Sequence, residues 1–387
     1  MVKKFTAQVV FLLAFCLAFV LILTSCKCIP GLEKKIVEVN LGEYSSLSGS
    51  LASFGINTHL GIQLALKEFN AKADDTGYRF KLITIDNEGD EKKAALAVEN
   101  LVKQKAVAII GEVSSNLSIA GARVAQQYKV PMISPGSTST KVTKIGEYIF
   151  RACFDDTFQG TVMARFAYDD LKARKVAILR DTSSEYSIGL AESFISKFKE
   201  LGGEILIDEK YKSGELDFKI QLLKIKAKKS DAIYVPGYYT EMGLIARQAR
   251  QLGIIDAKFL GGDGWDSSQL YSIGGEAING AFFTNHFAVE SPEERAKTFV
   301  ANFRREYELI PDANAALAYD SAYLIINAVL KSQSTDPEKI RIELNKTKNF
   351  PGVTGDISFS AGRGPIKGAV IVQVDGKINR FVTTVSP

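Results

Sequence analysis

Histidine, cysteine and tryptophan are scarce in this chain of 387 residues, which limits the chemistry open to it. It has two histidines, His59 and His286, four cysteines and one tryptophan. No Cys-x-x-Cys pair occurs, and Cys26 and Cys28 are only two positions apart. The sequence therefore predicts no metal site.

The motifs of nucleotide-binding proteins and serine hydrolases are also missing. The chain has no Gly-x-Gly-x-x-Gly fingerprint, P-loop or Gly-x-Ser-x-Gly elbow, so we expect no cofactor. His59 falls in a segment of helical periodicity and His286 near an expected crossing between lobes, so no Ser/His/Asp set is evident. These absences argue against an enzyme. The formal net charge is only +4, and no basic stripe with interleaved aromatics occurs, which argues against nucleic acid as a partner.

The N-terminus has the features of an export signal. Lys3 and Lys4 precede the apolar run 9–23, which is short for a membrane-spanning helix. Leu23-Thr24-Ser25-Cys26 follows and resembles the lipobox of bacterial lipoproteins, in which a cysteine receives lipid before cleavage. A plain secretory cleavage site beside a cysteine is the alternative. We expect residues 1–25 to be a signal peptide, Cys26 the lipidated residue and 26–35 a tether, which predicts an extracytoplasmic, membrane-anchored protein.

Two cysteines would remain as thiols after this processing. These are Cys28 and Cys153. A disulfide between them is formally possible, but nothing in the sequence supports it.

The rest of the chain alternates short apolar runs with helical patterns, in two sets. The first set predicts strands at 36–45, 80–87, 107–112 and 130–134, and helices at 56–70, 91–103 and 116–128. After a break around 140–160, the second set predicts strands at 175–181, 203–210, 231–237 and 258–263, and helices near 187–201, 216–229 and 240–252. At 46% hydrophobic residues, a chain of this length can bury a large core. The pattern predicts an α/β fold of two Rossmann-like lobes, each with a parallel sheet covered on both faces.

The C-terminal third departs from this rhythm. It predicts helices near 292–307, 312–331 and 336–346, then a hairpin over 367–384 that turns at Asp375-Gly376. Because these helices must pack back on a finished lobe, we expect three crossings, the second around 281–285 and the third near 350–356. The predicted lobes are 36–155 with 286–352, and 156–285 with 353–387.

Four predicted strands end in loops that carry hydroxyls, aromatics and one acid. The first loop holds Ser114 and Ser115, and the second holds Ser134, Gly136, Ser137, Thr138 and Ser139. The third holds Tyr238 and Tyr239, and the fourth Asp263 and Trp265. Ligands of open parallel sheets bind outside the carboxyl ends of the strands, so two facing lobes would line one cleft with these loops.

The residue types in these loops suit a free amino acid. Free N–H groups at a helix start, with a hydroxyl from Ser115, favour a carboxylate. Asp263 lies between glycines and can hold an ammonium through a charge-assisted bond. The plainer alternatives are helix caps, a turn aspartate and core aromatics. The combination favours capture of a ligand over catalysis.

Several segments resemble a known family in both content and order. They are 46–71, the GEVSSN loop at 111–116, PMISPGSTSTKVT (131–143), Tyr186-Ser187-Ile188-Gly189, GYYTEMGLIARQAR (237–250) and GGDGWDS (261–267). Together they look like the branched-chain amino-acid (Leu/Ile/Val) binding proteins of ABC importers, the type I periplasmic binding proteins. The resemblance covers roughly 36–385. It implies two lobes, a hinge of three crossings and closure on the ligand.

The resemblance also implies roles for individual residues. Ser115 and Thr138 match the residues that hold the ligand carboxylate, and the carbonyl of Gly136 and the carboxylate of Asp263 match groups that hold the ammonium. Phe54, Tyr186 and Tyr238 match contacts to the ligand side chain or to the closing lobe.

Three positions depart from the family pattern. Ser114 stands where a cysteine can occur, Asp263 where the family has glutamate, and Phe54 where a tyrosine can stand. Trp265 adds bulk near the pocket. The departures leave open which side chain fits.

Taken with the resemblance, the sequence predicts a monomeric, lipid-anchored receptor that captures a branched-chain or other hydrophobic or aromatic amino acid and delivers it to an ABC permease. A receptor of the same fold for an amide, urea or short peptide, with a sensory or regulatory role, is the alternative.

Overall fold

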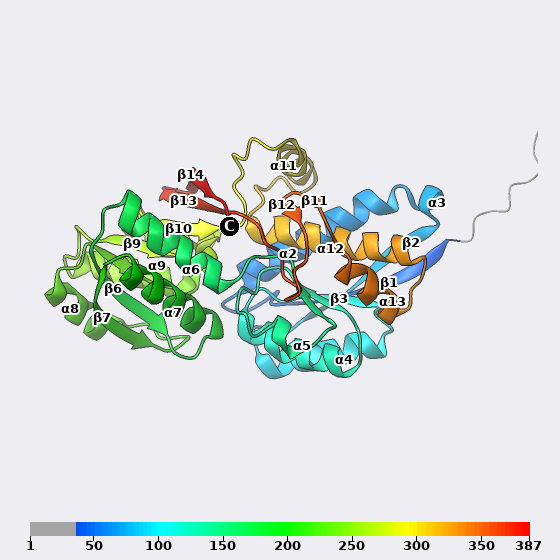
Figure 1. Ribbon diagram of the computed structural model, residues 1–387, viewed down its shortest axis with the longest axis horizontal. Helices are drawn as coiled ribbons and strands as arrows, with labels where there is room; N and C mark the ends of the chain where they lie inside the picture. The colour runs from blue at the N-terminus through cyan, green and yellow to red at the C-terminus, as the bar shows by residue number, and fades with distance from the viewer. Residues whose placement is uncertain (1–35) are drawn as a thin grey trace, which may run out of the picture.

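The computed structural model describes residues 36–387, which form two α/β lobes side by side along the long axis of the molecule (Figure 1). The predicted signal peptide, the tether, Cys26 and Cys28 lie outside the described residues. No helix in the described part of the chain is long and apolar enough to cross a membrane.

The first lobe is built on a five-stranded parallel sheet of order β2-β1-β3-β4-β5. Its strands are β1 (Val37–Ser45), β2 (Tyr78–Asp86), β3 (Ala108–Ile110), β4 (Met132–Ser134) and β5 (Ile149–Arg151). The helices between them are α2 (Ala52–Asn70), α3 (Ala73–Thr76), α4 (Glu91–Lys103) and α5 (Ser115–Gln127). A short 3₁₀ turn, η1 (Thr143–Ile145), precedes β5.

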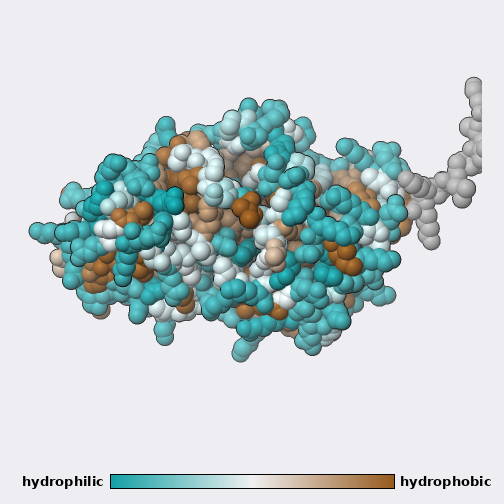
Figure 2. Space-filling model, in the orientation of Figure 1, coloured by the Kyte–Doolittle hydropathy of each residue, from teal (hydrophilic) through white to brown (hydrophobic). Residues whose placement is uncertain are grey.

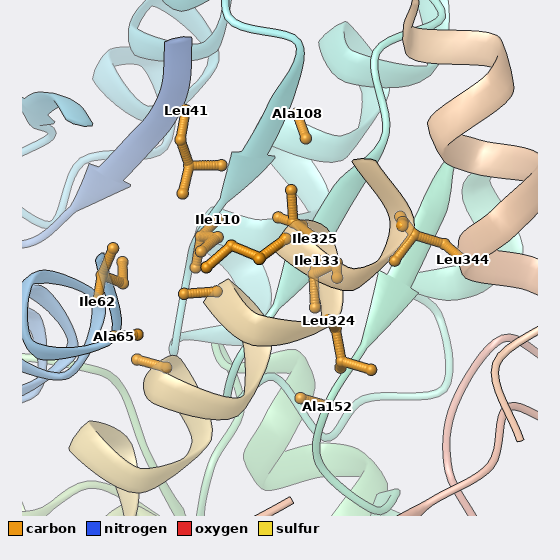
Figure 3. Packing of buried hydrophobic residues seen from close by; sticks show 14 of the residues in the cluster. Leu41, Ile62, Ala65, Ala108, Ile110, Ile133, Ala152, Leu324, Ile325 and Leu344 are labelled. Carbon is orange, nitrogen blue, oxygen red and sulfur yellow. The ribbon is translucent and has the colours of Figure 1, made fainter. Parts of the chain in front are cut away.

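Strand periodicity divides the core of this lobe between two faces. Ala108 and Ile110 of β3 pack against α2 and the C-terminal helices, whereas Ile109 packs against α4 and α5. Figure 3 shows the first face, where Ile62 of α2 and Ile325 approach Ile110. Apolar residues on both sides of one strand explain why the sequence reads as a continuous apolar run.

The second lobe is built on a seven-stranded sheet of order β14-β13-β10-β9-β8-β6-β7. Its parallel strands are β6 (Lys175–Asp181), β7 (Glu204–Tyr211), β8 (Ala232–Tyr234), β9 (Lys258–Gly261) and β10 (Phe282–Asn285). The hairpin β13 (Ala369–Asp375) and β14 (Ile378–Val385) adds two antiparallel strands, as the Asp375-Gly376 turn predicts. The helical segments are α6 (Asp156–Arg165), η2 (Phe166–Asp170), α7 (Glu185–Glu200), α8 (Lys219–Lys228), α9 (Tyr239–Gln251), η3 (Asp263–Trp265), α10 (Ser268–Gly274) and η4 (Gly275–Ile278). Both sheets have the parallel cores expected from the sequence.

The C-terminal helices return to the first lobe. They are α11 (Glu294–Tyr307), α12 (Ala313–Ser332) and α13 (Pro337–Asn345), and α12 packs along α2. The strands β11 (Phe350–Gly352) and β12 (Gly355–Ile357) pair with each other. Ile357 and Phe359 belong to the first lobe's core, so the chain stays with that lobe beyond the expected boundary at 352.

The third crossing therefore lies nearer 360–368, and a buried ionic cluster fastens it. Asp320 of α12 accepts hydrogen bonds from the N–H groups of Val353 and Thr354, at 2.7 and 3.0 Å. Lys367 donates to the Thr354 hydroxyl and, at 3.4 Å, to the carbonyl of Ala152 on the first crossing. Burial lowers the pKa of Lys367 to about 8. The cluster links two crossings to α12.

Candidate functional site

The loop after β3 is held in place by a buried acid, Glu112. Its Oε2 accepts from the N–H groups of Val113 (2.7 Å) and Ser114 (3.2 Å), and its Oε1 accepts from Ser46 Oγ (2.7 Å) and Asn87 Nδ2 (2.9 Å). The next residue, Ser115, begins α5, whose thirteen residues give its N-terminus the partial positive charge of a full helix. The loop thus presents Ser115 at a site suited to an anion.

The loop after β4 packs against this one. Ser137 Oγ donates to the carbonyls of Glu112 and Val113 at 3.0 and 2.9 Å. A Cβ at Gly136 would lie 3.1 Å from Cγ1 of Val113, so a larger residue would require the Val113 side chain to shift. The backbone N–H of Ser139 donates to Ser115 Oγ at 3.3 Å. Ser115 and Thr138 are therefore brought together at one edge of the first sheet, as predicted.

Aromatic residues connect this edge to the second lobe. The hydroxyl of Tyr238 donates to Ser114 Oγ across the cleft at 3.2 Å. The ring of Tyr238 stacks on Tyr186, with centroids 5.2 Å apart and planes at 13°, and meets Phe54 edge-on at 5.8 Å. The Gly264 N–H donates to the Tyr186 hydroxyl at 3.0 Å, directly beside Asp263. These four aromatic and serine side chains lie in one group, as the sequence suggested.

Trp265, which the sequence placed near the pocket, is not part of this group. Its side chain is fully buried in the core of the second lobe, and its Nε1 donates to the carbonyl of Val235 at 3.1 Å. A Cβ on Gly261 would come within 2.2 Å of the indole. The ring therefore supports the loop that carries Asp263 from behind.

Asp263 is fixed by two partners that the sequence did not single out as site residues. Gln159 Nε2 donates to its Oδ1 at 2.8 Å, and His286 Nε2 lies 3.1 Å from its Oδ2. Burial lowers the pKa of His286, which favours the neutral ring with its proton on Nε2, facing the carboxylate. His286 Nδ1 has no hydrogen-bond partner among the described residues, so no serine there completes a Ser/His/Asp set.

A second carboxylate, Asp156, faces the same region. It begins α6, is 2% exposed, and neither of its oxygens has a hydrogen-bond partner of normal geometry in residues 36–387. Its backbone N–H donates to the Thr138 carbonyl at 3.0 Å. Burial, followed by the charge of Asp263, raises the pKa of Asp156 well above its usual range, and the Thr138 hydroxyl opposes the shift only in part.

The other buried polar atoms without a partner in the described chain include several near Asp156 and Asp263. They are Thr138 Oγ1, Gln159 Oε1 and the hydroxyl of Tyr234. Burial raises the pKa of Tyr234, and the charges of Asp156 and Asp263 raise it further. A buried polar atom without a partner is costly, and a cluster of them marks a place where a ligand supplies the missing bonds. Asp156 and Gln159 carry no local sequence signal, because they fall in or next to the break at 140–160, where no helix was predicted.

The lobes enclose this region. Tyr239 donates to the Ser50 carbonyl at 2.7 Å, and Asn116 Nδ2 to the Ser183 carbonyl at 3.1 Å, both from one lobe to the other. A cavity of about 430 Å³ at the cleft mouth is lined by Ser114 and Tyr238 but by none of the deeper site residues. The polar cluster therefore lies behind the Ser114–Tyr238 contact, inside a closed cleft.

No group of three or more His, Cys, Asp or Glu side chains in the described part of the chain is arranged to hold a metal ion. Cys153 is buried and forms no disulfide within residues 36–387, and burial raises the pKa of its thiol to about 12.

A family model described as periplasmic binding protein matches residues 38–378. The chain belongs to this family. It is 31% identical over 350 residues to the Leu/Ile/Val-binding protein homolog 2 of Brucella abortus, a match that covers 89% of this chain and 93% of that protein. The resemblance inferred from the sequence is thus confirmed, and relatives of this kind are solute-binding proteins of ABC importers rather than enzymes.

Two crystal structures show the same fold. The leucine-binding protein LivK of Thermotoga maritima is 38% identical with a TM-score of 0.86, and the match covers 90% of this chain and 99% of that one. The branched-chain amino-acid binding protein LivJ of Streptococcus pneumoniae, crystallised in complex with isoleucine, is 35% identical with a TM-score of 0.86, covering 91% and 100%. The two-lobed type I periplasmic binding protein architecture is therefore established for this chain.

Proposed function

We propose that this protein is a lipid-anchored extracytoplasmic receptor that captures a free hydrophobic L-amino acid between its lobes and delivers it to the permease of an ABC importer. One observation carries the choice of ligand: the closed cleft buries Asp156 without a partner close to Asp263. A buried carboxylate must either take up a proton or be balanced by a cation, and the charge of Arg151 offsets the burial of Asp156 only in part. The ammonium of an amino acid supplies such a cation, whereas a neutral amide or urea does not.

In this proposal the first lobe binds the carboxylate of the amino acid, and both lobes contribute to the ammonium site. Ser115, the N-terminus of α5 and the hydroxyl of Thr138 hold the ligand carboxylate. Asp263 holds the ammonium together with the Gly136 carbonyl, and Asp156 adds a second negative charge.

The side chain of the ligand would lie against the aromatic group. Phe54, Tyr186 and Tyr238 form an apolar wall, and Ser114 contributes a small polar edge. This wall suits a branched or aromatic side chain. Isoleucine in the related LivJ complex supports a ligand of this size.

The lipid anchor rests on Leu23-Thr24-Ser25-Cys26 alone. These residues lie outside the described part of the chain, so the anchor stays a prediction from the sequence. The monomeric state is likewise a prediction from the sequence.

Calorimetric titration of the purified protein with the twenty L-amino acids tests the proposal. We expect one molecule bound per chain, with a dissociation constant in the micromolar range or tighter, about −8 kcal/mol. D-Leucine and leucinamide serve as controls, because the first misplaces the ammonium and the second lacks the carboxylate. Heat with urea or amides but with none of the amino acids would instead support the receptor for neutral ligands.

A further inference from the structure

Helix α8 at the tip of the second lobe turns apolar side chains toward solvent. Ile220 and Leu223 are 72% and 52% exposed and, three positions apart, lie on one helical face. The opposite face supplies Leu222 and Ile225 to the core. The exposed apolar residues are therefore not needed to hold the helix on its lobe, because other residues do so.

Two further residues extend this surface. Leu216, just before the helix, is 73% exposed, and Ile255 is 70% exposed. Ile255 follows α9 in the turn that Lys226 of α8 touches, where Lys226 Nζ donates to the Leu252 carbonyl at 2.7 Å. We call these four side chains, Leu216, Ile220, Leu223 and Ile255, the α8 patch. Three of them are the most exposed large apolar side chains in the described part of the chain. Figure 2 shows apolar residues breaking the hydrophilic surface at this end of the molecule.

Lysines line α8 itself, whereas acids flank the patch at Leu216 (Glu215 and Asp217) and at Ile255 (Asp256). The ten residues of α8 include four lysines and no acid, and Lys229 follows directly. Lys224 pairs with Glu209 at 3.0 Å, and Lys219 lies 3.7 Å from Asp217. The surplus lysines at the C-terminal end of the helix, Lys228 and Lys229, are exposed. These lysines, unpaired within residues 36–387, favour an anionic partner over a second copy of the same patch.

We propose that the α8 patch docks onto an anionic lipid surface. A single exposed helix with an apolar stripe between lysines has the chemistry of an interfacial helix, with apolar groups for the acyl boundary and ammonium groups for the headgroups. The patch lies at the opposite end of the long axis from the point where the described chain begins (Figure 1). With an anchor at the N-terminus, a second attachment at α8 would lay the long axis along the membrane.

Vesicle co-sedimentation of the processed chain with Cys26→Ser tests this inference without a lipid anchor. The probes are vesicles of phosphatidylglycerol and phosphatidylcholine in equal parts, and vesicles of phosphatidylcholine alone. We expect binding to the first that falls as salt rises, and little binding to the second. Lys228→Gln with Lys229→Gln should lower the partition coefficient about fivefold per charge. Ile220→Ser with Leu223→Ser should lower it as well.

Ile310→Ser with Lys331→Gln is the matched control, because it removes an apolar group and a charge of similar exposure from the first lobe. This control should bind the vesicles like the parent protein. Equal binding by parent, α8 variants and control would overturn the inference. So would a concentration-dependent dimer that the α8 variants abolish, since it would make a second copy the occupant. Amino-acid affinity, measured on the same samples, reports on the proposed receptor function independently.

Discussion

Replacing Asp263 with alanine removes the carboxylate assigned to the ligand ammonium and little else. Gln159 Nε2, which donates to Asp263 at 2.8 Å, also donates to Thr284 Oγ1 at 2.8 Å and so keeps a partner. His286 is neutral, because burial lowers its pKa, but its Nε2–H loses its acceptor at 3.1 Å, which should cost about 1–3 kcal/mol of stability. The change should therefore weaken binding more than it destabilises the fold.

The expected loss follows from leaving a charge unpaired in a closed site. Truncation of one partner of a buried charge pair costs about 2–5 kcal/mol, which corresponds to roughly 30- to 4000-fold in the dissociation constant. Because Asp156 still faces the ammonium, we expect the lower half of that range. Calorimetry with the best amino-acid ligand measures the loss, and a thermal melt without ligand confirms that the variant is folded.

Asp208→Asn is the control for charge. Asp208 pairs with Arg180 at 2.6 Å on the second sheet, outside the cleft, so this exchange removes one negative charge without touching the site. If both Asp263→Ala and Asp208→Asn bind the ligand with the affinity of the parent protein, the reasoning is refuted. Asp263 would then be only a turn residue.

Three further outcomes are expected. Binding should weaken as the pH falls, because burial and Asp263 raise the pKa of Asp156 and a protonated carboxyl cannot balance an ammonium. Asp156→Asn should weaken binding and flatten the pH profile. An affinity of the parent protein that does not change between pH 8 and pH 5 would contradict this. His59 lies 2.7 Å from Glu43, and this hydrogen bond raises the pKa of His59 above 6.5. The pair therefore stabilises the fold below pH 6.5, and the stabilisation is lost as the pH rises through the raised pKa. His59→Ala should lower the melting temperature more at pH 5.5 than at pH 9. Cys26→Ser should move the protein out of the membrane fraction after a wash in ~0.5 M salt, which screens surface charges, and its retention there would disprove the lipobox assignment.

Much of the architecture follows from the sequence because buried parallel strands leave a clear apolar signal. The two sets of strands, the C-terminal helices and the hairpin at Asp375-Gly376 all appear as expected. The strand β5 and the helix α6 were missed in the break at 140–160. The strand has only three residues, and α6 lacks a clear apolar stripe, since its buried residues include Asp156, Gln159 and Gly160.

The site residues that the sequence did not reveal also lack a local apolar pattern. Loop residues such as Ser115, Thr138 and Asp263 stand out because they follow apolar strands. Asp156 and Gln159 become buried only when the lobes and helices pack, and the contact of His286 with Asp263 joins residues 23 positions apart. Interactions of this kind depend on tertiary packing and leave no local pattern.

The unpartnered carboxylate of Asp156 gives an empty receptor a reason to stay open. If the cleft binds an amino acid as proposed, closure around it would place the ligand ammonium beside this acid, whereas closure without ligand would strip water from the acid and add no cation. The closed shape then reports that the cleft is loaded. Under the proposed function, an ABC importer that recognises the closed shape would hydrolyse ATP only for receptors that carry ligand.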